Sequence, residues 1–96
     1  MVKITLFATA AVMVATASAR NCKAGINYCG WNLLNIGNYQ SQVDAALRQK
    51  GWQVNGKNIH DTIFSCLGGP NGEITVLDWC AGNCADGGEN HDDFCN

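Results

Sequence analysis

The sequence predicts an α+β fold in which one amphipathic helix packs on a small, largely antiparallel sheet in the order β-α-β-β. Three observations predict it. Residues 39–50 carry a helical apolar pattern, residues 62–80 hold two β-rich runs around a turn, and the chain of 96 residues contains 6 cysteines. A domain this small buries too little apolar surface to be stable through its core alone. We therefore expect disulfides to staple the fold.

The first 19 residues are predicted to be a secretory signal peptide. A basic start at Lys3, an apolar run over residues 4–15 and the ending Ala17-Ser18-Ala19 form its three-part pattern, with cleavage after Ala19. The alternative, a core helix or membrane anchor, is disfavoured because the run is too short to span a bilayer. We expect residues 20–96 to form a single disulfide-rich domain, secreted as an extracellular monomer without a membrane anchor.

The net charge of the mature chain disfavours two classes of function. Once Lys3 leaves with the signal peptide, 5 Lys and Arg remain against 8 Asp and Glu. An acidic protein is repelled by anionic membranes and by nucleic-acid phosphates. A cationic membrane toxin and a nonspecific nucleic-acid binder are therefore disfavoured.

Residues 25–34 are expected to form the first strand. Cys29, Trp31 and Leu33 alternate with small or polar residues, which is the period of a strand with one buried face. Gly30 inside this run indicates a bulge or a close approach of another backbone.

Residues 39–50 are expected to form the helix. Apolar residues recur at the spacing of one helix face: Tyr39, Val43, Ala46 and Leu47. Asn38 is expected to cap the amino end, and Gly51 is placed to end the helix in a left-handed conformation.

The rest of the chain is expected to form a hairpin and a tail. Asn55-Gly56 predicts a tight turn. Residues 62–67 and 73–80 are β-rich and flank a Gly/Pro/Asn loop, which predicts a hairpin. Residues 81–96 cannot build a core of their own and are expected to be held by disulfides.

Six cysteines in an exported chain predict three disulfides. The cysteines are Cys22, Cys29, Cys66, Cys80, Cys84 and Cys95. If the first strand runs antiparallel to the last, the preferred pairing is Cys22–Cys80, Cys29–Cys66 and Cys84–Cys95. A competing pairing exchanges Cys80 and Cys84, which gives Cys22–Cys84 and Cys80–Cys95.

No metal or other cofactor is predicted. Cys80, Cys84, His91 and Cys95 loosely match the spacing of a zinc site, but an oxidising compartment favours disulfides. The acidic segment 86–93 could suggest calcium, but it departs from the EF-hand spacing. A solvated acidic loop is the favoured interpretation.

No catalytic residue is predicted. His60-Asp61 with Ser65 invites a triad, but neighbouring side chains on a strand point to opposite faces and would not pair. His91 with an adjacent aspartate could supply acid and base groups for a small ribonuclease, without a second catalytic group placed nearby. Most aromatic side chains are expected in the core, and Trp52, just beyond the helix, is the predicted binding residue.

The cysteine order and its flanking residues carry a resemblance over nearly the whole mature chain. The matching residues are Tyr28-Cys29-Gly30, Gly37-Asn38-Tyr39, Ile63-Phe64-Ser65-Cys66, the run 69–74 and Cys80, Cys84 and Cys95. In these features the chain resembles the small secreted cysteine-rich proteins of filamentous ascomycete fungi, many of which are candidate effectors. The resemblance implies export, disulfides and a role outside the cell, and it supplies no catalytic residue.

The function predicted from these observations is non-enzymatic recognition by a disulfide-stabilised fungal effector outside the cell. The expected partner is an extracellular protein or a cell-wall glycan of a host or a competitor. The alternatives are a small secreted hydrolase such as a ribonuclease, acting through His60 or His91, and an antimicrobial protein. The acidic charge weakens the last of these.

Overall fold

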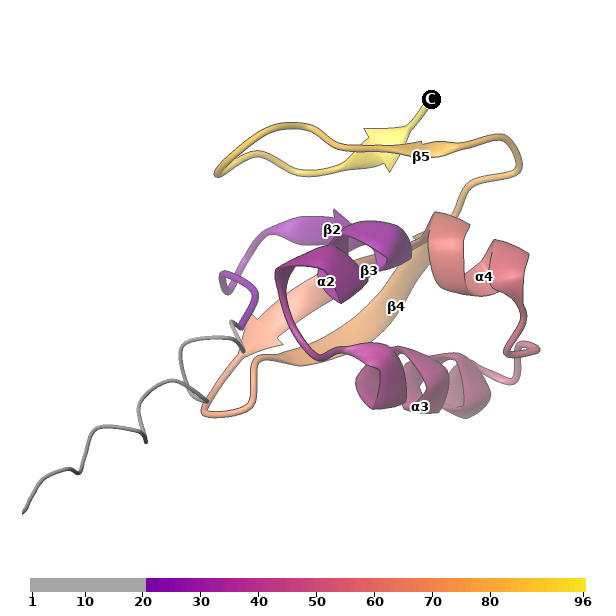
Figure 1. Cartoon of the computed structure of the whole chain (residues 1–96), viewed down its shortest axis with the longest axis horizontal. Coiled ribbons are helices and arrows are strands. Elements are labelled where there is room, and N and C mark those ends of the chain that lie inside the picture. The colour runs from indigo at the N-terminus through magenta and orange to yellow at the C-terminus, as the bar shows by residue number, and fades with distance from the viewer. Residues whose placement is uncertain (1–20) are drawn as a thin grey trace, which may run out of the picture.

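The structure, a computed structural model, describes residues 21–96, so the predicted signal peptide lies outside the described residues. Within these residues, three helices and five strands make up an α+β fold, as predicted (Figure 1). In chain order the elements are β2 (Asn27–Cys29), α2 (Gly30–Ile36), α3 (Gln40–Lys50), α4 (Gly56–Asp61), β3 (Thr62–Gly68), β4 (Glu73–Trp79), β5 (Cys84–Ala85) and β6 (Phe94–Cys95). No helix in this part of the chain is long and apolar enough to cross a membrane.

The main sheet has the strand order β2-β3-β4, and both neighbouring pairs are antiparallel. The central strand β3 places Phe64 beside Tyr28 of β2 and Val76 of β4. The predicted hairpin is therefore confirmed as β3 and β4. Because β3 lies between the other two strands, β2 and β4 run in the same direction.

Side chains of β3 pack into two different clusters of buried residues, one on each face of the sheet. Phe64 and Cys66 belong to the main core, which contains Leu33 of α2 with Val43 and Leu47 of α3. Ile63, the residue before Phe64, packs instead with Cys29, Cys80 and Cys84. Successive strand residues point to opposite faces, so the helices cover one face and the start of the tail packs against the other.

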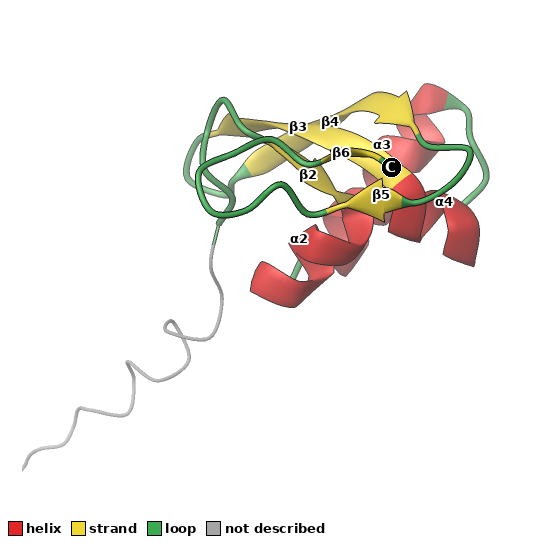
Figure 2. Ribbon diagram, turned by 90° about the horizontal axis from the view of Figure 1, so that it is seen from above, coloured by secondary structure: helices red, strands yellow, loops and turns green. Residues whose placement is uncertain are grey.

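The tail, residues 81–96, lies beside β2. Its strands β5 and β6 pair antiparallel, with Cys84 opposite Cys95. The backbone N–H of Asp93 donates to the carbonyl of Asn27 at 2.9 Å. Figure 1 and Figure 2 both show the tail next to β2. Figure 1 shows α3 on the opposite side of the domain from the tail.

The predicted strand over residues 25–34 is wrong beyond Cys29. Only residues 27–29 are strand, and α2 follows at once. Gly30, Leu33 and Leu34 stand at i, i+3 and i+4, so the same short run also fits one face of a helix. Packing of Leu33 into the main core selects the helix over the strand.

Gly30 confirms the close backbone approach predicted for it. A Cβ atom at this position would lie 1.7 Å from the carbonyl oxygen of Ile59. The absence of a side chain therefore lets α2 begin directly against α4.

Replacing Gly30 with alanine is expected to destabilise the protein by about 1–3 kcal/mol, because backbone must move to admit the methyl group. Gly56→Ala is the matched control, since its Cβ would meet nothing within 4 Å. Thermal unfolding of the two variants measures the difference. Equal melting temperatures would show that α2 and α4 do not meet at Gly30.

The predicted helix is confirmed as α3, although its first turn differs. Tyr39, rather than Asn38, occupies the N-cap position, and no side chain caps this end. The buried Tyr39 hydroxyl instead accepts from the N–H of Cys22 at 3.0 Å and donates to the carbonyl of Gly72 at 2.7 Å. The tertiary role of Tyr39 thus sets where the helix starts. Gly51 ends it with φ of 86°, as predicted.

Asn55-Gly56 is the N-terminus of α4 rather than a tight turn. The Asn55 side chain accepts a hydrogen bond from the N–H of Asn58 at 2.8 Å. Asparagine is favoured both in turns and at helix N-caps, so the dipeptide alone does not distinguish the two. This short helix determines the geometry of the candidate site.

Candidate functional site

All six cysteines form disulfides, as predicted, but the preferred pairing is wrong. The bonds are Cys22–Cys66, Cys29–Cys84 and Cys80–Cys95. Only Cys80–Cys95 appeared among the alternatives, in the competing pairing.

The strand order explains the observed pairing. Cys22 precedes β2, and the start of β2 lies beside the end of β3, so Cys22 meets Cys66 rather than Cys80. Cys29 stands opposite Ile63, whereas Cys66 points to the helix-covered face with Phe64. Cys29 and Cys66 therefore lie on opposite faces of the sheet and cannot bond.

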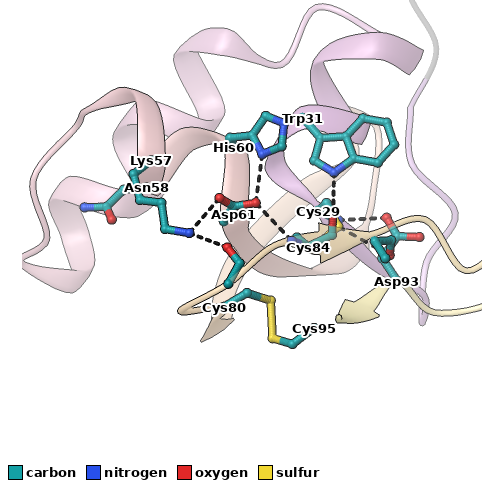
Figure 3. Close-up of polar contacts among 12 residues, drawn as sticks. Cys29, Trp31, Lys57, Asn58, His60, Asp61, Cys80, Cys84, Asp93 and Cys95 are labelled. Carbon is teal, nitrogen blue, oxygen red and sulfur yellow. Dashed lines mark hydrogen bonds and ion pairs between the residues drawn. A yellow bond between two sulfur atoms is a disulfide. The ribbon is translucent and has the colours of Figure 1, made fainter.

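Asp61, the last residue of α4, connects α4 to the tail (Figure 3). Its carboxylate side chain is only 6% exposed. One oxygen accepts from the Cys84 N–H at 2.9 Å and lies 2.8 Å from Nδ1 of His60, while the other accepts from the Lys57 ammonium at 2.9 Å. The Asp61 carbonyl also accepts from the N–H of Cys80. Asp61 thus fixes both ends of the segment 80–84.

Burial alone would raise the pKa of Asp61, because a carboxylate is poorly solvated inside a protein. Hydrogen bonds from Lys57, from the Cys84 N–H and from His60 outweigh this burial. Together they lower the pKa of Asp61 from its ordinary value of 3.8 to about 2. Asp61 is consequently an anion at any physiological pH.

The expectation that His60 and Asp61 cannot pair is wrong. It assumed a strand, whereas both residues end α4, where Nδ1 of His60 reaches the carboxylate. The His60 ring also stacks on Trp31 with ring centroids 6.0 Å apart. Trp31 in turn donates from Nε1 to the Cys84 carbonyl at 2.9 Å. His60 is thus an oriented imidazole whose side chain remains 55% exposed.

Asp93 is a second buried carboxylate and holds the other end of the tail. It accepts from the N–H of Cys29 at 2.8 Å, from the Asn32 amide at 3.0 Å and from the N–H of Gly87 at 2.8 Å. Asp92 accepts from the N–H of Asn27. Asp86 also accepts from the Asn32 amide at 3.3 Å. The segment 86–93 is therefore not simply a solvated acidic loop: three of its carboxylates attach the tail to β2 and α2.

The structure separates the two histidines. His91 lines a hollow of about 460 Å³ between β2, α2 and the loop 86–93, whereas His60 stacks on Trp31 at the end of α4. Across residues 21–96, no group of three or more His, Cys, Asp or Glu side chains is arranged to hold a metal ion.

Trp52, the predicted binding residue, is partly buried and packs against the main core. It lines a shallow hollow of about 320 Å³ with Gln53, Asn58 and Trp79, which we call the aromatic cleft. Sequence reasoning missed the last two residues. Trp79 ends β4 and is 40% exposed, and the Lys57 ammonium lies 5.4 Å from the centre of its ring.

Scans against protein-family models, curated proteins and solved structures found no match to this chain.

Proposed function

We propose that this chain is a secreted, non-enzymatic recognition protein of the effector type, acting outside the cell on a host or a competitor. Its partner is an extracellular protein or a cell-wall glycan, bound without nucleic acid or a membrane anchor. Three disulfides fit a small extracellular, disulfide-stabilised protein. The fungal origin rests on the resemblance of the cysteine order.

The observation that carries this proposal is a rigid frame beside an open aromatic surface. Asp61, Asp93 and the Cys29–Cys84 bond fix the tail to the rest of the domain. Trp52 and Trp79 remain partly accessible beside α4, where they line the aromatic cleft with Asn58. A rigid frame lowers the entropy lost when a partner binds. Aromatic side chains held in this way are typical of recognition surfaces.

The hydrolase alternative is favoured by one observation, the His60–Asp61 pair. An oriented, exposed imidazole beside a buried carboxylate is the arrangement of a general base. What argues against catalysis is the environment: the bonded or stacked neighbours found for the pair are Trp31, Lys57 and Cys84. Both members of the pair therefore have structural partners: His60 stacks on Trp31, and Asp61 holds Lys57 and the Cys84 N–H.

Purified oxidised protein is expected to turn over neither RNA nor polysaccharide, and to bind plant or fungal wall fractions or apoplastic proteins. Its His60→Ala/His91→Ala variant is expected to bind equally well, because neither histidine lines the aromatic cleft. Product assays and sedimentation or pull-down assays measure the two properties. Reduced and alkylated protein is the control, and it should not bind.

Turnover that the double histidine variant abolishes would overturn the proposal in favour of a hydrolase. The two single histidine variants would then show which site acts, since His60 and His91 lie in different parts of the structure.

A further inference from the structure

We propose that the aromatic cleft binds an uncharged saccharide, which stacks on the indoles of Trp52 and Trp79 and is hydrogen-bonded by Asn58. This inference rests on the proposed function and names the ligand class for one site. It combines the fixed geometry of three side chains with the absence of charge in the cleft lining.

Three separate elements bring the cleft residues together. Trp52 follows the end of α3, Asn58 lies in α4, and Trp79 is the last residue of β4. The Trp52 N–H donates to the Leu47 carbonyl at 2.9 Å beyond the left-handed Gly51, which fixes where the indole leaves α3. The position of Trp52 is therefore set by the helix end rather than by a free loop.

The amide of Asn58 is also held in place. Its Nδ2 donates to the backbone carbonyl of Gln53 at 2.7 Å. This bond uses the donor end of the amide and leaves Oδ1 as the acceptor that a hydroxyl group can use. An amide oriented in this way binds without first losing rotamer freedom.

Trp79 is positioned by Lys57. The Lys57 ammonium lies over the Trp79 ring and is itself held by the Asp61 carboxylate and the Gly82 carbonyl. A cation over an indole face fixes the ring by electrostatic attraction. Because Asp61 pairs with Lys57, this cation is neutralised locally and does not make the cleft basic.

The lining chemistry selects the ligand. Two indoles and two primary amides offer apolar faces beside neutral hydrogen-bonding groups, with no charged side chain among the lining residues. A pyranose ring has the matching surface: a C–H face that packs on an indole and a rim of hydroxyl groups that amides bind. A charged ligand finds no ion-pair partner among these lining residues.

The size of the cleft favours a saccharide over a protein partner. A cavity of about 320 Å³ is at the lower end of small-ligand pockets, which span about 300–1,000 Å³. A stable protein interface covers about 800 Å² of each partner, so a protein partner would have to contact surface beyond the cleft. A short stretch of glycan fits the cleft without further surface.

The inference is tested by titrating the intact oxidised protein with neutral oligosaccharides: cellohexaose, chitohexaose and laminarihexaose. Isothermal titration calorimetry gives the affinity, and amide NMR shifts locate the site. At least one ligand is expected to bind and to shift the residues of the aromatic cleft. Trp52→Ala and Trp79→Ala are each expected to weaken binding about tenfold or more, equivalent to about 1.4 kcal/mol.

Matched variants separate binding from folding. Phe94→Ala removes an aromatic side chain that is 51% exposed and lies outside the cleft, so it is expected to leave binding unchanged. Trp79→Phe keeps an aromatic face and is expected to restore part of the affinity lost in Trp79→Ala. Asn58→Ala should weaken binding without changing the stacking surface. Circular dichroism and intact mass confirm folding and three disulfides in each variant.

Failure of this inference is distinguishable from failure of the proposed function. If the protein binds wall fractions or apoplastic protein but no neutral oligosaccharide, the saccharide assignment is wrong and the recognition function stands. Protein binding that is lost in Trp52→Ala, without any saccharide binding, would make the cleft a protein contact instead. Saccharide binding that both tryptophan variants retain would place the site elsewhere. Histidine-dependent turnover would contradict the proposed function itself.

Discussion

Replacing both Cys29 and Cys84 with alanine is expected to lower the free energy of unfolding by about 4 kcal/mol. This bond closes a span of 55 residues, and such a loop strongly restricts the unfolded chain. It also joins the end of β2 to the first residue of β5, so its loss removes the covalent link between β2 and the tail. Urea unfolding followed by tryptophan fluorescence measures the change.

The matched control is Cys80→Ala/Cys95→Ala. This bond closes a span of only 15 residues, so the expected loss is about 3 kcal/mol, smaller by about 1 kcal/mol. If removal of Cys80–Cys95 cost more than removal of Cys29–Cys84, the attachment of the tail to the sheet would not be the main stabilising link.

Acidification is expected to destabilise the protein as the pH falls from about 4 to about 2, and Asp61→Asn is expected to reduce this dependence. The folded-state pKa of Asp61 is about 2 and its ordinary value is 3.8. A lowered folded-state pKa means that the stabilisation is fully present above the ordinary value and is lost as protons bind the folded protein. The difference in pKa corresponds to about 2 kcal/mol of stability.

A double-mutant cycle checks the cause. Lys57→Met removes the ammonium that lies 2.9 Å from Asp61, and it is expected to cost less stability in the Asp61→Asn background than in the wild type. Urea unfolding at pH 7, 4, 3 and about 2 measures both effects. An unchanged pH dependence in Asp61→Asn would show that other carboxylates control acid unfolding.

The parts of the fold that were predicted correctly are those determined by residues close together in the sequence. Helix α3 carries its own periodicity, and Gly51 supplies the conformation that ends it. The hairpin of β3 and β4 follows from two β-rich runs and the turn between them. These signals depend on residues close in the chain, so no tertiary information is needed.

The parts predicted wrongly depend on contacts between distant residues. The change from β2 to α2 occurs because Leu33 enters the main core and Gly30 meets Ile59. The disulfide pairing depends on β3 being the central strand, which no local pattern specifies. Placing Cys66 and Cys29 on opposite faces then excludes the preferred pairing.

In the candidate site, too, sequence reasoning reached the residue with a local signal and missed those placed by contacts between distant residues. Trp52 was identifiable because it follows a helix end, but its partner Trp79 was not. Strand β4 has a bulge at Leu77, which has no partner between the pairs Phe64–Val76 and Ile63–Asp78. The bulge breaks the simple alternation of side chains between the two sheet faces, so the face on which Trp79 lies does not follow from the sequence. The role of Asp61 was missed because α4 was not recognised. A helical assignment for residues 56–61 predicts only the pairing of Asp61 with Lys57, at i and i+4, because the contacts of Asp61 with Cys80 and Cys84 join distant parts of the chain.

The disulfide connectivity has a consequence for a protein exposed to proteases. The three bonds span residues 22–66, 29–84 and 80–95, and these spans overlap without a gap. Any single peptide-bond cleavage between Cys22 and Cys95 therefore falls inside at least one covalent loop. A nicked chain remains one molecule, and no single cut within that range releases a fragment.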